Sequence, residues 1–245
     1  GIKMKVKFNG HKIIASVVVA AMSIAFIPKI TGSGNVLAAT TKSAANTCLC
    51  TTDIASPVAP ANTDSAWQGS YVYFGTYDDG TTVDPIKFRV LAPNTTAYSG
   101  TTGNSTMFLD SDVALDTVHY YDDDSNVWAD SQLKAYLNGS FKNDCFSPLE
   151  IAAIYESVGG QIAELKGEKI FVLESSEAKN TNYGYSNTIG VATNRDKKDE
   201  WWLRTSGGGD EAIKVDEHGS LRSELVDYGN YIAPALNVDN NSIIF

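Results

Sequence analysis

The chain has 245 residues, of which 19 are basic and 29 acidic, so its formal net charge is −10. An acidic surface repels nucleic acid and anionic lipid, which excludes both as partners. The three cysteines, Cys48, Cys50 and Cys145, are too few for a disulfide scaffold, so a buried core has to hold the fold together.

Residues 1–39 have the pattern of a cleavable signal peptide, with Met4 as the expected start. Lysines precede an apolar run from Ile13 to Ile27, and Val36–Ala39 offers small residues to a signal peptidase. The alternative is a membrane anchor. However, this run spans roughly 22 Å as a helix, short of the ~30 Å bilayer core, so we expect no stable membrane span after cleavage. The remaining 14 basic and 29 acidic residues give a net charge of −15, and we expect a secreted or cell-surface protein.

Residues 40–66 are rich in Thr, Ala, Ser, Asn and Pro and predict a flexible linker. Cys48 and Cys50 lie in it without a nearby histidine, and Ala45–Thr47 does not form a lipid-attachment motif. A loosely constrained tail is favoured over a metal site or an intermolecular disulfide.

The folded domain, residues 67–245, opens with predicted strands over 71–77, 86–90 and 107–109, which are rich in aromatic and β-branched residues. Residues 110–126 are acidic and predict a solvated loop. An EF-hand starting at Asp122 needs Gly and Glu where this chain has Val127 and Leu133. We therefore predict no cofactor, and an irregular calcium site is the open alternative.

Two helices are predicted next. Apolar residues at helical spacing indicate the first from Trp128, with Asn138-Gly139 as its stop. The second begins with Ser147 as N-cap, Pro148 and Glu150, which form a capping box. Both helices are interpreted as structural.

Further strands are predicted over 169–173, 201–204, 212–215 and 232–238, with 243–245 closing the chain, and a polar loop over 174–200. A hairpin turn is expected at His218-Gly219. Strands come first and last with the helices between them, which predicts an α+β fold in a single domain.

The chemical inventory of the domain is sparse. Only His119 and His218 remain after signal removal, and the H-E-x-x-H, C-x-x-C and G-x-S-x-G motifs are absent. We therefore predict no catalytic residue and no metal ligand. Gly207–Gly209 lacks the lysine of a phosphate loop and predicts a flexible hairpin tip.

A candidate ligand-binding surface lies between the apolar segments Trp201–Leu203 and Pro234–Leu236, with one of Trp201 and Trp202 expected in the core. The guanidinium of Arg204 suits bidentate contacts, and tyrosine supplies contact area at low entropy cost. Alternatively, Arg204 forms an ion pair with Asp210 or Asp227 and thereby holds the adjoining loops together. The predicted ligand-binding residues are Arg204, Asp210, Glu211, Tyr228 and Tyr231.

Six blocks stand out in chain order: Tyr73–Tyr77, Ile86–Leu91, Val127–Asn138, Phe146–Glu150, Trp201–Arg204 and Pro234–Leu236. Together they resemble an uncharacterised domain family, a domain of unknown function, found in secreted and surface proteins of Gram-positive, clostridia-like bacteria. That family has no activity to carry over. Its members often continue past the equivalent of residues 243–245, which implies that the chain is a piece of a longer surface protein.

The order of elements is also similar to the C-type-lectin-like fold of formylglycine-generating enzymes. This similarity implies first and last strands in one sheet, two helices and a long loop region before the last strands. The lectin calcium signatures and the enzyme's cysteine pair are missing, so the similarity implies a display scaffold without that chemistry.

The predicted function is therefore a non-catalytic display module that binds a surface carbohydrate or protein ligand. One alternative is a carbohydrate-active or protein-modifying enzyme that uses acidic residues. Another is a structural component of the cell envelope. A deep pocket that combines carboxylates with aromatic residues would favour the enzyme, and a shallow face built from loops would favour the binding module.

Overall fold

The computed structural model describes residues 60, 66–99, 105–120, 125–158 and 162–242, all within one unit, Ala38–Phe245. The predictions for residues 1–39, most of the linker, Cys48, Cys50, Asp122 and residues 243–245 lie outside these ranges.

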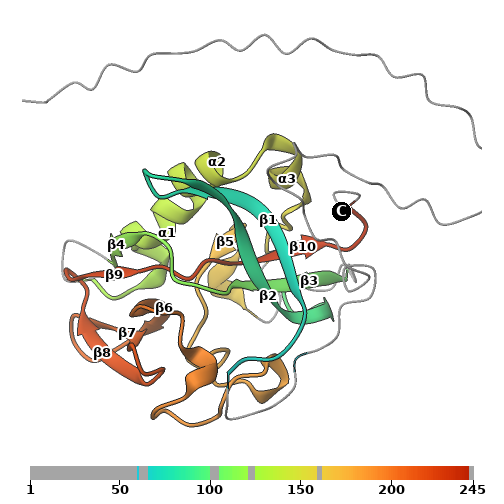
Figure 1. Ribbon diagram of the computed structural model, residues 1–245. Coiled ribbons are helices and arrows are strands. Elements are labelled where there is room, and N and C mark those ends of the chain that lie inside the picture. Colours follow the sequence, from blue (N-terminus) through green and yellow to red (C-terminus); the bar gives the residue numbers. More distant parts are fainter. Residues whose placement is uncertain (1–59, 61–65, 100–104, 121–124, 159–161, 243–245) are drawn as a thin grey trace, which may run out of the picture. The chain divides into compact units, whose positions relative to one another are not determined.

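The first of two five-stranded sheets has the strand order β1-β2-β3-β10-β5, and all its pairs are antiparallel (Figure 1). As predicted, 71–77 and 235–238 lie in one sheet, although β2 and β3 separate them. The strands are β1 Tyr71–Asp78, β2 Val83–Thr95, β3 Thr106–Ser111, β5 Ile170–Phe171 and β10 Ala235–Asp239.

The second sheet has the order β4-β9-β6-β7-β8 and is antiparallel except for one parallel register pair between Trp201 and Tyr231. The β7–β8 hairpin turns at His218-Gly219 as predicted. The short strands β4 and β9 were not predicted. The strands are β4 Thr117–His119, β6 Trp201–Ser206, β7 Glu211–Val215, β8 Leu221–Leu225 and β9 Gly229–Tyr231.

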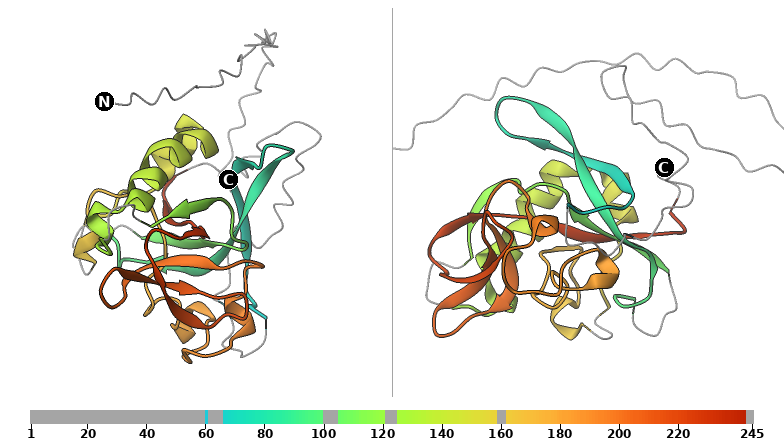
Figure 2. Two further views of the ribbon diagram at one scale, coloured as in Figure 1. Left: turned by 90° about the vertical axis from the view of Figure 1, so that its left-hand side faces the viewer. Right: turned by 60° about the horizontal axis from the view of Figure 1, so that its bottom comes forward.

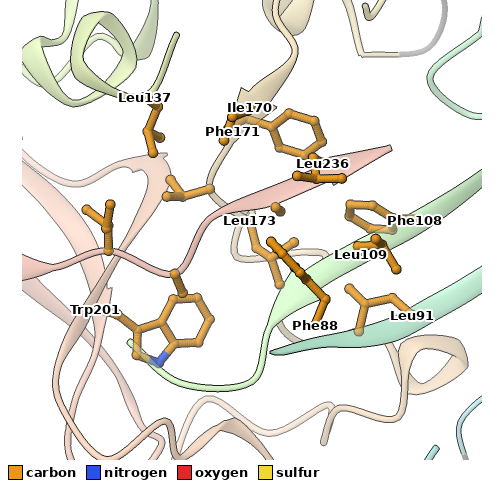
Figure 3. Packing of buried hydrophobic residues seen from close by; sticks show 14 of the residues in the cluster. Phe88, Leu91, Phe108, Leu109, Leu137, Ile170, Phe171, Leu173, Trp201 and Leu236 are labelled. Atoms are coloured by element: carbon orange, nitrogen blue, oxygen red, sulfur yellow. The ribbon is translucent and has the colours of Figure 1, made fainter. Parts of the chain in front are cut away.

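A single hydrophobic cluster involves both sheets, and the two tryptophans of β6 are part of it. Trp201 belongs to this cluster together with Phe88, Leu173 and Leu236 (Figure 3). The Trp202 ring instead meets Tyr120 edge to face at 5.5 Å. Successive side chains of a strand point to opposite faces, so two fully buried tryptophans show that β6 is covered on both sides. The prediction that at least one of them is core is confirmed.

The helical segment that begins near Trp128 breaks at Asn138-Gly139, as predicted. The backbone of Gly139 is non-helical (φ −101°, ψ −108°), and a second short helix follows this kink and ends at Cys145. The Asn138 side chain accepts from the backbone N–H groups of Lys169 and Ile170 and donates to the Ile170 carbonyl. It fastens the end of the first helix to β5. The elements are η2 Trp128–Asp130, α1 Gln132–Tyr136, η3 Leu137–Phe141, which contains the kink, and α2 Lys142–Cys145.

The predicted capping box of the next helix, α3 (Pro148–Ala153), is confirmed. The Glu150 N–H donates to Ser147 Oγ, and the Ser147 N–H donates to Glu150 Oε2. Glu150 Oε1 also accepts from the Gly75 N–H of β1. A Cβ at Gly75 (φ +70°) would lie 2.5 Å from the Phe146 ring, so glycine permits this close approach. A local helix signal thus also fixes the sheet to the helices.

The polar segment 174–200 folds into an ordered layer with short turns at η5 Thr181–Tyr183 and η6 Thr193–Arg195, after η4 Ala163–Leu165 (Figure 2). Its Arg195 is fully buried and donates to the carbonyls of Gly219, Ser186 and Gly190. Burial lowers the pKa of Arg195 to about 10. Two mostly antiparallel sheets together with two helical regions agree with the predicted α+β class.

Candidate ligand-binding face

The turn between β6 and β7 is held by hydrogen bonds and is not the flexible tip that its glycines suggested. The Asn126 side-chain amide donates to the carbonyls of Gly209 (2.8 Å) and Glu211 (3.0 Å). Ser206 Oγ donates to the Asn126 carbonyl at 2.8 Å, and the Gly207 N–H donates to the Glu211 carbonyl at 2.7 Å. The backbone that presents Asp210 and Glu211 is therefore preorganised.

Three of the predicted site residues, Asp210, Glu211 and Tyr228, come together at this end of the β7–β8 hairpin. Glu211 is in register with Leu225, the Val226 N–H donates to the Asp210 carbonyl at 3.1 Å, and the Tyr228 N–H donates to the Leu225 carbonyl. The Tyr228 side chain is 57% exposed. We call Asp210, Glu211 and Tyr228 the hairpin face.

Tyr231, the fourth residue, lies on β9 in register with Thr117 and Trp201. It is 37% exposed. Strand register places Tyr231 beside β4 and β6 and not beside Leu225. It is therefore not one of the three residues of the hairpin face.

Arg204, the fifth predicted ligand-binding residue, does not belong to any exposed surface and lies outside the hairpin face. Its side chain is fully buried. Its Nη1 lies 2.6 Å from Glu177 and its Nε 2.6 Å from Glu164. Arg204 forms these ion pairs with Glu164 and Glu177 and not with Asp210 or Asp227, the partners expected in the alternative interpretation. Arg204 is buried because β6 lies between β7 and β9 and is covered on both faces.

The Arg204 cluster, formed by Arg204, Glu177, Glu164 and Tyr98, fastens the segment 164–177 to β6. Tyr98 Oη donates to Glu177 Oε1 at 2.6 Å, and Arg204 Nη1 also donates to the Val172 carbonyl. Burial acts to lower the pKa of Arg204, but the two glutamates outweigh burial and raise that pKa. The guanidinium therefore stays charged and holds the strand that leads into the hairpin face.

A second charged centre missed by sequence reasoning consists of Asp110, Tyr185 and Lys197. Asp110 was placed in a solvated loop but is fully buried in β3, 2.7 Å from Lys197 Nζ. Burial is the main cause that raises the pKa of Asp110 and lowers that of Lys197 to about 8. The aromatic residues within the polar segment, Tyr183 and Tyr185, were the available sign that this segment is packed.

The other reactive side chains offer little chemistry. His119 and His218 are exposed. Burial, with Asp144 and Asp116 nearby, raises the pKa of the Cys145 thiol to about 12, so this thiol is not reactive at neutral pH. Within the described ranges, no group of three or more His, Cys, Asp or Glu side chains could hold a metal ion. Nor does any helix there have the length and apolar character to cross a membrane.

Comparison with known families identifies the family of this domain and gives no function for it. Residues 103–240, more than half of the chain, match the family described as a domain of unknown function, DUF6273, and the chain belongs to that family. The match includes β3 to β10 and leaves β1 and β2 outside. No curated protein and no solved structure matches the chain.

Proposed function

We propose that the domain is a non-catalytic binding module that presents the hairpin face to a carbohydrate or protein ligand. The observation that supports this proposal is a preorganised turn that carries two carboxylates at the end of the hairpin where an exposed tyrosine follows β8. A rigid backbone reduces the entropy lost on binding, and tyrosine adds contact area with few rotatable bonds.

The side chains of the hairpin face are available to a ligand. Among the described residues, none of the salt bridges of the domain involves Asp210, Glu211 or the adjacent Asp227. Carboxylates accept hydrogen bonds from sugar hydroxyls or from basic side chains, and a tyrosine ring offers an apolar surface to either. In contrast, Asp110 and Glu177 are covered and paired with cations, so they are poorly placed to act on a ligand.

We further propose that the fold is C-type-lectin-like. In support, the first and last strands share a sheet, two helical regions lie between them, and the long segment 174–200 precedes the final strands. The separation of β1 from β10 by two strands is a departure from that pattern. As in the lectin-like display scaffolds, the ligand would contact loops rather than a deep pocket.

We also propose that the mature protein is secreted or exposed on the surface of a Gram-positive bacterium, because of the signal pattern in residues 1–39. N-terminal sequencing of exported material is expected to read from near Ala39 or Thr40. Mature protein that retains residues 4–38 would contradict export by cleavage.

Binding should depend on Tyr228. Tyr228→Ala is expected to abolish binding to bacterial or host surface preparations, while stability changes by no more than about 0.5 kcal/mol, as usual for exposed sites. The matched control is Tyr73→Ala, because Tyr73 is also exposed (41%) but lies on β1 in the other sheet. Binding assays with calcium and with a chelator would separate a metal-free site from a calcium-dependent one.

Equal loss of binding in both variants, or unchanged binding in Tyr228→Ala, would place the site elsewhere. A collapse of the melting temperature in Tyr228→Ala would show that this tyrosine is part of the scaffold.

A further inference from the structure

The centre formed by Asp110, Tyr185 and Lys197 holds a buried amine against a buried carboxylate. Lys197 Nζ lies 2.7 Å from Asp110 Oδ2 and also donates to the Ser111 carbonyl. Tyr185 Oη donates to the same carboxylate oxygen, Oδ2. The carboxyl group comes from β3, and the amine and the hydroxyl donor come from two places in the segment 174–200.

The centre is closed to water. The side chains of Asp110 and Lys197 are fully buried, and the Trp201 ring centre lies 4.8 Å from Nζ. Asp110 Oδ1 is buried and has no hydrogen-bond partner. Burying two charges and leaving one carboxylate oxygen unpaired is costly, and a neutral product that lacks Oδ1 would remove both costs.

We propose that Lys197 and Asp110 condense to form an intramolecular amide bond between Nζ and Cγ. This inference is independent of the proposed binding function, because the centre lies in the core. The bond would join β3 covalently to the segment 174–200, which follows β5, and would hold that segment in place.

The reaction balances within the centre. One proton passes from the ammonium group to the carboxyl group, which leaves both neutral, and the Nζ lone pair then forms the bond to Cγ. The Cγ–Oδ1 bond breaks, and Oδ1 departs as water with two of the three ammonium hydrogens. Tyr185 donates to Oδ2, where negative charge develops in the tetrahedral intermediate, and thereby stabilises it. In the product the amide N–H faces the Ser111 carbonyl, and Oδ2 keeps its bond from Tyr185.

Peptide mapping of the purified full chain tests the proposal. Trypsin releases Asp110 in the peptide 90–134 and would cleave after an unmodified Lys197. The expected result is a branched product in which 90–134 is joined to 196–198, lighter than the two peptides together by one water molecule. Tyr185→Phe should slow its appearance during refolding. Lys197→Arg should abolish it, because guanidinium keeps its proton.

Complete cleavage after Lys197 and an unlinked peptide 90–134, after prolonged incubation of the folded protein, would overturn the proposal and leave an ion pair only. Loss of water from 90–134 alone would also overturn it, because it would indicate cyclisation at Asp110-Ser111. Both results come from the natural chain, so the test does not depend on whether a variant folds.

Discussion

Replacing Arg204 with alanine is expected to destabilise the domain by about 3–5 kcal/mol, the range for breaking a buried ion pair by removing one partner. Glu177 would remain buried beside Tyr98 with its cation lost. The fastening of the segment 164–177 to β6 would be lost as well. Denaturant unfolding of the two proteins gives the difference in free energy of unfolding.

Arg222→Ala is the matched control, because Arg222 pairs with Asp216 at the surface. Exposed ion pairs contribute about 0–1 kcal/mol, so this variant should unfold close to the natural protein. Comparable effects of the two arginine substitutions would contradict the assignment of Arg204 to the core.

Trp202→Ala is expected to cost about 3–5 kcal/mol, as is typical when a buried tryptophan is truncated. The indole Nε1 donates to the Val118 carbonyl of β4 at 2.9 Å, and the ring packs against Tyr120. The substitution opens a cavity between β6 and β4, and the loss of the indole leaves the Val118 carbonyl without this donor. Thermal and denaturant unfolding measure the effect.

Trp202→Phe separates these two contributions, since it keeps an aromatic ring but removes the donor. It should be less destabilising than alanine. If Trp202→Ala unfolds like the natural protein, the second face of β6 is not packed as described.

The sequence predicted correctly those elements that are determined by residues close together in the chain. The capping box at Ser147 and Glu150 involves neighbouring residues only, and it was found where expected. The helix break at Asn138-Gly139 was also found where expected, but the hydrogen bonds of the Asn138 side chain to β5, across 31 and 32 residues of sequence, could not be predicted locally. The strands β4 and β9 are three residues each, too short for a pattern of alternation to reveal them.

The candidate site was predictable only in part. Asp210 and Glu211 lie at the same end of the β7–β8 hairpin as Leu225, which follows from the turn at His218-Gly219, and Tyr228 comes shortly after Leu225 in the chain. Arg204 was misplaced because a strand covered on both faces can bury a charge, and its partner Glu177 is distant in sequence. The same limit applies to Asp110 and Lys197, which are separated by 87 positions and paired by tertiary structure alone.

The central claim, that the hairpin face binds the ligand, is tested most directly by amide hydrogen exchange of the natural domain with and without the surface fraction that it binds. Binding at this face predicts slower exchange over residues 207–211 and 226–231, with little change over β1 and β2. Protection confined to β1 and β2, or no protection over 207–211 and 226–231 in the bound state, would contradict it.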